Sequence, residues 1–151
     1  MVGLGGVQGL KRFAFGTHLV LDGRGVEPWR LEPEEMGRTL ALLAPAWPLG
    51  RRLARLTATD DSGASVVHTG SSGYLAAHGY PERGLLVVEA FGVGEADSAH
   101  FAAEVETHFD LGGYDLRLSR YGRFLPEDEE LLRRVLLGLR SYAAARLVPG
   151  G

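Results

Sequence analysis

The sequence contains no cysteine among its 151 residues, so no disulfide can form. No apolar run approaches the roughly 20 residues of a membrane span, and the N-terminus lacks the charged-then-apolar pattern of a signal peptide. Basic residues are not in excess, since the formal net charge is -3, whereas nucleic-acid binding calls for a basic patch. These absences favour a cytoplasmic protein that binds neither membranes nor nucleic acid.

The composition is that of an ordinary globular protein, with 45% hydrophobic and 23% charged residues. The length fits one domain, which we place at residues 13–123. Residues 1–12 are glycine-rich and we expect a flexible leader there. Residues 124–151 are strongly helical, and we expect this C-terminal helix to pack on the same domain.

Periodicity predicts the secondary structure. Period-2 alternation indicates strands, and apolar positions three and four apart indicate helices. Strands are expected at 13–21, 51–59, 64–69, 74–77, 85–91 and 114–121, and helices at 33–44, 97–109 and 126–147. This order predicts an α+β two-layer sandwich with helices on one face of the sheet.

The stretch 72–94 organises the chain. Two apolar runs flank a polar turn that contains Pro81, which predicts a β-hairpin. The predicted turn carries His78, Tyr80 and Glu82. An imidazole, a phenol and a carboxylate on a rigid hairpin can form part of a site, although chance proximity on a surface loop gives the same pattern.

Here the sequence resembles a known family. His-Gly-Tyr-Pro-Glu at 78–82, the acidic strand residue Glu89, and Phe91 with Gly94 look like the core of the bacterial S-adenosylmethionine decarboxylases. That family has Glu-Ser-His, three residues of strand, His-Thr-Trp-Pro-Glu, an apolar strand and Phe-Thr-Cys-Gly. Residues 16–20 and 116–123 resemble its first and late strands. The resemblance implies an antiparallel sheet, and two protomers that meet near their sites.

Two residues of the pattern are missing, a serine and a cysteine. In the resembled family a serine attacks the preceding peptide bond and becomes an N-terminal pyruvoyl cofactor. Without gaps, that serine position is Gly73, and the family's later cysteine falls on Val93. Glycine has no hydroxyl that could attack an amide or become a ketone, so we expect no pyruvoyl cofactor.

Two nearby serines are possible substitutes. A one-residue slip turns Ser72 to the opposite face of the strand unless a bulge restores it. Ser71 keeps the face but lies about 7 Å farther along the strand. If either serine is processed, the chain is cut near residue 72 and a pyruvoyl group forms.

Other site residues follow from the resemblance. Ser65 is the ungapped match of a serine that assists cleavage and catalysis, with Ser62 as the other candidate, although turns favour serine for local hydrogen bonding alone. The resemblance gives His78 a role in cleavage and places Tyr80 beside the substrate's adenine. The catalytic candidates are therefore His78, Ser72 and Ser65, and the substrate-binding candidates are Tyr80 and Glu82. Alternatively, Tyr80 only covers the turn and His78 bonds to backbone.

A metal site is a weaker hypothesis. His100, Glu104 and His108 recur every fourth residue, a spacing that can hold a metal between helical turns. The same spacing also gives a plain solvated pair. We expect no metal.

Three functions remain open. The first is a non-catalytic S-adenosylmethionine decarboxylase homologue of polyamine (spermidine) biosynthesis, which binds an S-adenosylmethionine-type ligand or acts as the partner of an active subunit. The second is an active self-processing decarboxylase that uses Ser72 or Ser71. The third is a structural or interaction protein. A two-layer sandwich leaves one sheet face uncovered, so we expect a homodimer or a heteromer with a related decarboxylase subunit.

Overall fold

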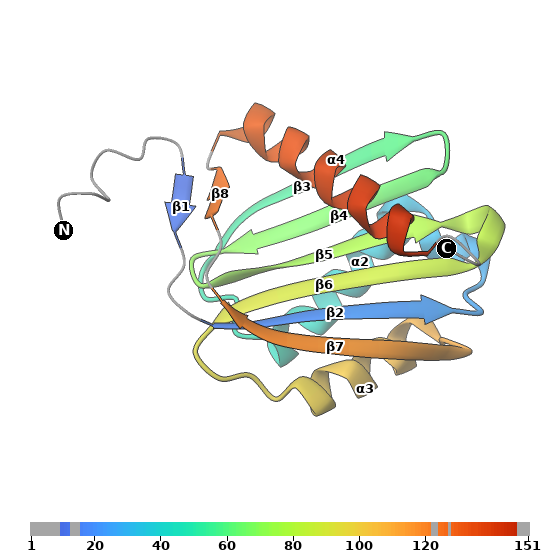
Figure 1. Ribbon diagram of the computed structural model, residues 1–151, viewed down its shortest axis with the longest axis horizontal. Helices are drawn as coiled ribbons and strands as arrows, with labels where there is room; N and C mark the ends of the chain where they lie inside the picture. Colours follow the sequence, from blue (N-terminus) through green and yellow to red (C-terminus); the bar gives the residue numbers. More distant parts are fainter. Residues whose placement is uncertain (1–9, 13–15, 122–123, 127, 148–151) are drawn as a thin grey trace, which may run out of the picture.

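The structure is a computed structural model that describes residues 10–12, 16–121, 124–126 and 128–147. Its centre is a six-stranded antiparallel sheet in the order β3-β4-β5-β6-β2-β7 (Figure 1). The strands are β2 Gly16–Arg24, β3 Arg52–Asp60, β4 Gly63–Gly70, β5 Gly73–Tyr80, β6 Leu85–Val93 and β7 Gly113–Tyr121. The predicted α+β class with an antiparallel sheet is confirmed.

Two helices cover one face of this sheet: α2, Pro33–Leu43, and α3, Ser98–Phe109 (Figure 1). Pro33 opens α2 with two glutamates behind it, where acidic groups complement the helix dipole. Asp97 caps α3 by accepting a hydrogen bond of 3.0 Å from the His100 amide. The apolar stripes of both helices join the inward-facing residues of the sheet in the main core.

The third helix, α4, Glu129–Arg146, lies across the opposite face (Figure 1). Asp128 caps it at the Leu131 amide, 3.0 Å away. Leu132 and Leu136 pack in a second apolar cluster with side chains of β3, β4, β5 and β6. The expected arrangement with helices on one face therefore holds for α2 and α3, whereas α4 adds a layer on the other side.

The short elements complete the chain. A small sheet pairs β1, Leu10–Arg12, with β8, Phe124–Pro126, so the last residues of the expected leader 1–12 form a strand. Residues 1–9 lie outside the described part. Single turns of 3-10 helix are η1 Pro28–Leu31, η2 Ala44–Ala46 and η3 Pro81–Arg83. In the part of the chain that the structure describes, no helix is long and apolar enough to cross a membrane.

The hairpin predicted around residues 72–94 is confirmed as β5 and β6. However, the prediction that His78 and Tyr80 lie on its turn is wrong. Both belong to β5, which continues three residues past the apolar run because Ser65 and Ala64 on β4 pair with His78 and Gly79. Both side chains point to the face under α4, where they are buried.

Candidate active site

Four polar side chains form a buried row across the sheet under α4. We call Ser65, His78, Glu89 and His18 the relay; they come from β4, β5, β6 and β2. Ser65 Oγ lies 2.7 Å from His78 Nδ1, and His78 Nε2 lies 2.8 Å from Glu89 Oε2. His18 Nε2 lies 3.8 Å from the other Glu89 oxygen. Antiparallel register explains the row, because Ser65 directly opposes His78 and Glu89 is diagonal to it.

The hydrogen-bond network assigns the His78 tautomer. The Glu89 carboxylate oxygen Oε2 accepts a hydrogen bond from His78 Nε2, so this nitrogen carries the proton. Ser65 Oγ accepts a hydrogen bond of 3.1 Å from Arg140 Nη1 and can donate its own proton to His78 Nδ1. A serine hydroxyl, an imidazole base and an orienting carboxylate are the parts of a nucleophilic triad.

Arg140 of α4 closes the relay from above. Its guanidinium donates to the Ala64 carbonyl at 2.8 Å, to the Gly79 carbonyl at 3.0 Å and to Ser62 Oγ at 2.9 Å. Its Nε lies 3.0 Å from Asp60 Oδ2. With an exposed fraction of 1%, Arg140 is a buried cation held by backbone carbonyls and one partly exposed carboxylate.

The surroundings of Arg140 shift the pKa values of Asp60 and Tyr80. Burial acts to raise the pKa of Asp60, but hydrogen bonds from Ser62 and Arg140 outweigh it and bring the pKa to about 2. Burial raises the pKa of the Tyr80 phenol, whose hydroxyl donates to the Arg140 carbonyl at 2.9 Å. The guanidinium of Arg140 also lies 4.3 Å from the centre of the Tyr80 ring. A stacked base could therefore use this face of Tyr80 only if Arg140 moved.

The Ser65 and His78 end of the relay is closed to solvent in this structure. Ser65 and His78 have exposed fractions of 0%, and Glu89 has 2%. The triad-like geometry is thus chemically competent for proton transfer within the row, but a substrate cannot reach Ser65 while α4 is in place. In the described part of the chain, Glu89 and His18 line a cavity that reaches the relay from its other end.

Gly73 lies at the far end of β5, in close contact with β6. A Cβ at this position would lie 2.0 Å from the Phe91 carbonyl oxygen, which is far below contact distance. The backbone of β6 thus approaches so closely that a serine would require the strands to move apart. Gly73 and His78 are five positions apart along β5, a distance of about 17 Å at the usual rise per residue.

Ser71 and Ser72 form the turn between β4 and β5. Ser71 Oγ accepts a hydrogen bond of 2.8 Å from the Arg51 amide, and the Ser72 carbonyl accepts one of 2.9 Å from the Val93 amide. The structure therefore does not bring either serine to His78 of the same chain. It does bring Ser65 there, while Glu82 is exposed on η3.

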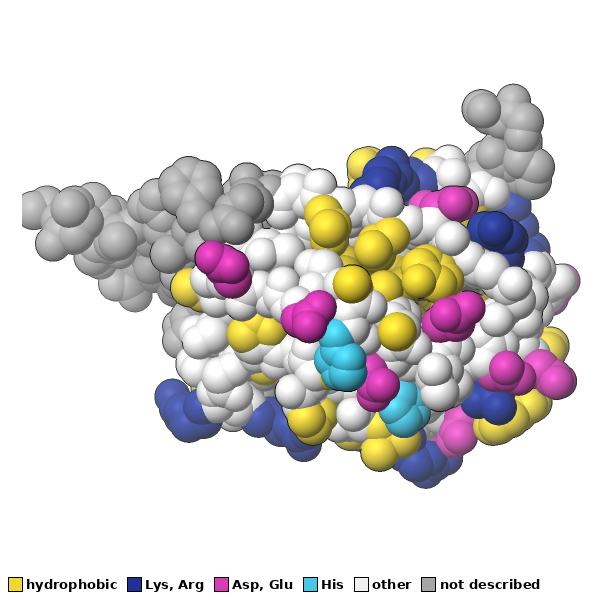
Figure 2. Space-filling model, turned by 90° about the horizontal axis from the view of Figure 1, so that it is seen from below, with side chains coloured by type: hydrophobic (Ala, Val, Ile, Leu, Met, Phe, Trp, Pro, Cys, Tyr) yellow, Lys and Arg dark blue, Asp and Glu magenta, His cyan; other side chains and the backbone are white. Residues whose placement is uncertain are grey.

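The acidic and imidazole groups of α3 form a surface pair. His108 Nε2 lies 3.4 Å from Glu104 Oε1, and both side chains are about one-third exposed. Figure 2 shows histidine and acidic side chains side by side on the surface around α3. Among the described residues, no group of His, Cys, Asp or Glu is arranged to hold a metal ion.

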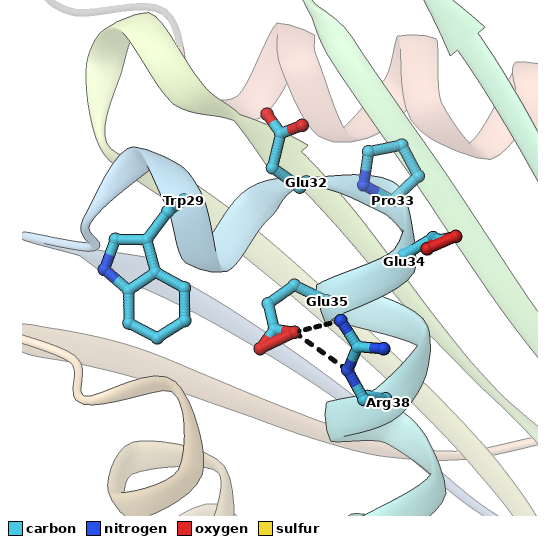
Figure 3. A pocket seen from close by; sticks show the side chains of 6 residues that line it. All are labelled: Trp29, Glu32, Pro33, Glu34, Glu35 and Arg38. Atoms are coloured by element: carbon cyan, nitrogen blue, oxygen red, sulfur yellow. Dashed lines mark hydrogen bonds and ion pairs between the residues drawn. The ribbon is translucent and has the colours of Figure 1, made fainter.

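A second hollow, of about 540 Å³, lies at the start of α2. Trp29, Glu32 and the first turn of α2 line it, and Arg38 supplies a positive charge (Figure 3). That charge is already used, because Glu35 accepts hydrogen bonds of 2.9 and 2.6 Å from Arg38. This hollow is shallow. It lies on the side of the sheet that α2 and α3 cover, whereas the relay lies on the side under α4.

Three residues of the site, Arg140, Glu89 and His18, were not among the sequence candidates. Arg140 lies on the buried stripe of α4, four positions after Leu136, and a charged residue on an apolar stripe is the signal that would have identified it. Glu89 interrupts the apolar run 85–91 in the same way. A buried carboxylate or guanidinium needs a partner, and such interruptions therefore point to polar clusters.

The comparisons with known proteins support the fold. No family model matches the sequence, and no curated protein matches it. Among solved structures, the fold is similar to that of the adenosylmethionine decarboxylase from Aquifex aeolicus, with a TM-score of 0.59 and 19% sequence identity. The match covers 71% of this chain and 90% of the Aquifex chain. The protein thus has an S-adenosylmethionine decarboxylase-like fold.

Proposed function

We propose that the protein is a non-catalytic homologue of the S-adenosylmethionine decarboxylases, which binds an S-adenosylmethionine-type ligand without forming a pyruvoyl group. The observation that carries this proposal is the close approach of β6 to Gly73, which leaves 2.0 Å between a Cβ and the Phe91 oxygen. A serine at the expected cleavage position has no room there. The decarboxylase-like fold supports the ligand class.

The relay supports ligand binding on its face of the sheet, at the end where Glu89 and His18 line a cavity. Ser65 and His78 match family positions in the sequence and form a hydrogen bond of 2.7 Å in the structure. Arg140 fills the space above them, in keeping with a site that retains its polar groups but does no chemistry. We place the protein in the cytoplasm, in polyamine (spermidine) biosynthesis, either alone or as the partner of an active decarboxylase subunit.

Intact mass and calorimetry test the proposal together. The purified chain should give one species of 16.3 kDa and no adduct with a carbonyl reagent. Titration with S-adenosylmethionine should release or absorb heat with saturation. A pair of fragments cut near residue 72 in the wild type, absent in Ser71→Ala/Ser72→Ala, would instead establish self-processing. An intact chain that binds no S-adenosylmethionine would leave an interaction protein that shares only the fold.

A further inference from the structure

A cavity of about 230 Å³ opens beside the relay, between the sheet and the last turns of α4. Its inner wall contains the relay side chains His18 and Glu89, which are almost fully buried. Its other walls are Arg117 of β7 and Arg146 of α4, with Tyr142 at the mouth. The cavity therefore connects the buried relay to solvent at the end of α4.

The two arginines share one carboxylate. Arg117 Nη2 lies 3.2 Å from Asp22 Oδ2, and Arg146 Nη2 contacts the other oxygen of Asp22. Arg146 Nε is buried and has no hydrogen-bond acceptor among the described residues. Two guanidinium groups against one carboxylate leave unused donors, because each guanidinium has five N–H groups in a fork that suits a carboxylate.

The opposite wall carries negative charge. Glu89 accepts from His78 through Oε2, and a carboxylate offers about four acceptor positions, so it can also accept from a ligand cation. Glu89 on this wall, and Asp22 beside the two arginines, together balance the charge of Arg117 and Arg146. Balanced and separated charges favour a zwitterion over a simple anion or cation.

The register fixes the separation of the two walls. Val20 of β2 pairs with Glu89 on one side and with Arg117 on the other, so all three point to the same face. Glu89 and Arg117 are therefore two strand spacings apart, or about 10 Å between Cα atoms. The small Val20 side chain leaves the space between them open.

We propose that this cavity binds the α-amino-carboxylate group of an amino-acid-type ligand. The carboxylate lies between Arg117 and Arg146, and the ammonium group lies against Glu89. At about 230 Å³ the cavity is smaller than sites that enclose a drug-sized molecule, so it takes the amino-acid group and leaves a nucleoside outside. The inference rests on the proposed function only in taking this sheet face as the ligand-binding face.

Four ligands separate the parts of the proposal. S-adenosylmethionine carries the amino-acid group and the nucleoside, L-methionine carries only the first, and methylthioadenosine only the second. Decarboxylated S-adenosylmethionine keeps the amine but lacks the carboxylate. We expect calorimetry to give binding of S-adenosylmethionine at least about tenfold tighter than that of its decarboxylated form, since one charge-assisted hydrogen bond changes affinity by that order. L-Methionine should shift the amide NMR signals of Val20 and Ser119.

Variants locate the effect. Arg117→Gln should weaken S-adenosylmethionine and L-methionine by about tenfold and leave methylthioadenosine unchanged. The control Arg24→Gln removes an arginine of similar exposure that also pairs with an aspartate, Asp115, but lies outside the cavity. It should leave all affinities unchanged.

The outcomes distinguish this inference from the proposed function. Equal binding of S-adenosylmethionine and methylthioadenosine, unaffected by Arg117→Gln, would overturn the amino-acid site and keep the proposed function. L-Methionine binding that Arg117→Gln weakens, without any nucleoside binding, would support the site and overturn the proposed ligand. Failure of all four ligands would overturn both.

Discussion

Arg140 Nη1 on α4 lies 3.1 Å from Ser65 Oγ on β4, although the residues are 75 positions apart in the sequence. Through this contact the C-terminal helix supplies a hydrogen-bond donor to the Ser65 hydroxyl of the relay. Two further carbonyl oxygens, of Ala64 and Gly79, also accept from the same guanidinium. The helix is therefore part of the site and not only a cover for the sheet.

Replacing Arg140 by methionine should lower the free energy of unfolding, because each buried carbonyl oxygen that loses its donor costs about 1–3 kcal/mol. Methionine keeps most of the volume but leaves the Ala64 and Gly79 oxygens without their donor. Urea unfolding measures the change. Arg134→Met on the exposed face of α4 is the matched control and should stay within about 0.5 kcal/mol. Equal effects of the two substitutions would contradict the role assigned to Arg140.

Gly73→Ser restores the serine that the family pattern requires, yet it should not produce cleavage. The added Cβ must push β6 away at Phe91, so we expect a lower melting temperature and an intact chain. Mass spectrometry and thermal unfolding measure both effects. Gly138→Ser on α4 adds a Cβ where no atom lies within 4 Å and should be tolerated. A stable, cleaved Gly73→Ser protein would show that the precursor backbone can adopt a processing conformation.

His68 makes stability depend on pH. Burial, together with Arg55 and Arg52, lowers its pKa to about 4 from 6.5. Between these values the unfolded chain binds more protons than the folded chain, so stability decreases as the pH falls from 6.5 towards 4. The loss from this residue is at most about 3 kcal/mol. Urea unfolding of His68→Leu should show a flatter slope in this window, whereas His100→Leu on the exposed side of α3 should keep the wild-type slope.

Leu136→Asp should detach α4 from the sheet. Leu136 is 1% exposed and packs in the second apolar cluster, between α4 and the sheet. A buried charge at this position should lower the free energy of unfolding by several kcal/mol. The uncovered face should bind a hydrophobic dye and promote self-association, which light scattering detects. Leu137→Asp, at a neighbouring leucine that is 38% exposed, should change neither property. Dye binding by both variants would argue against α4 as the cover.

The position of α4 on the sheet also affects the expectation of a partner subunit. The expectation of a dimer followed from a sheet with one open face, and α4 occupies much of that face. A homodimer or heteromer stays a prediction, because exposed apolar side chains remain elsewhere, such as Leu118 on the edge strand β7 with 54% exposed. Light scattering of the wild type at micromolar concentration tests it.

Local patterns predicted most of the architecture. Pro33 with its two glutamates begins α2, and the stripe of Phe101, Val105 and Phe109 is buried in α3, because caps and periodicity depend only on near neighbours. The hairpin of β5 and β6 was predicted for the same reason. Its turn was placed too early, because the apolar run ends at Ala77 and the sequence does not show that α4 buries the polar residues that follow.

Sequence alone determined the absence of a thiol, the glycine at position 73 and the polar residues at 65, 78 and 89. It could not join them into a row, since Ser65, His78 and Glu89 meet only through the register of three strands. Nor could it place Arg140 above them, since the side of the sheet that an amphipathic helix covers depends on which apolar face is open. The tertiary structure decided both, because side chains far apart in the chain share a site only when packing brings their backbones together.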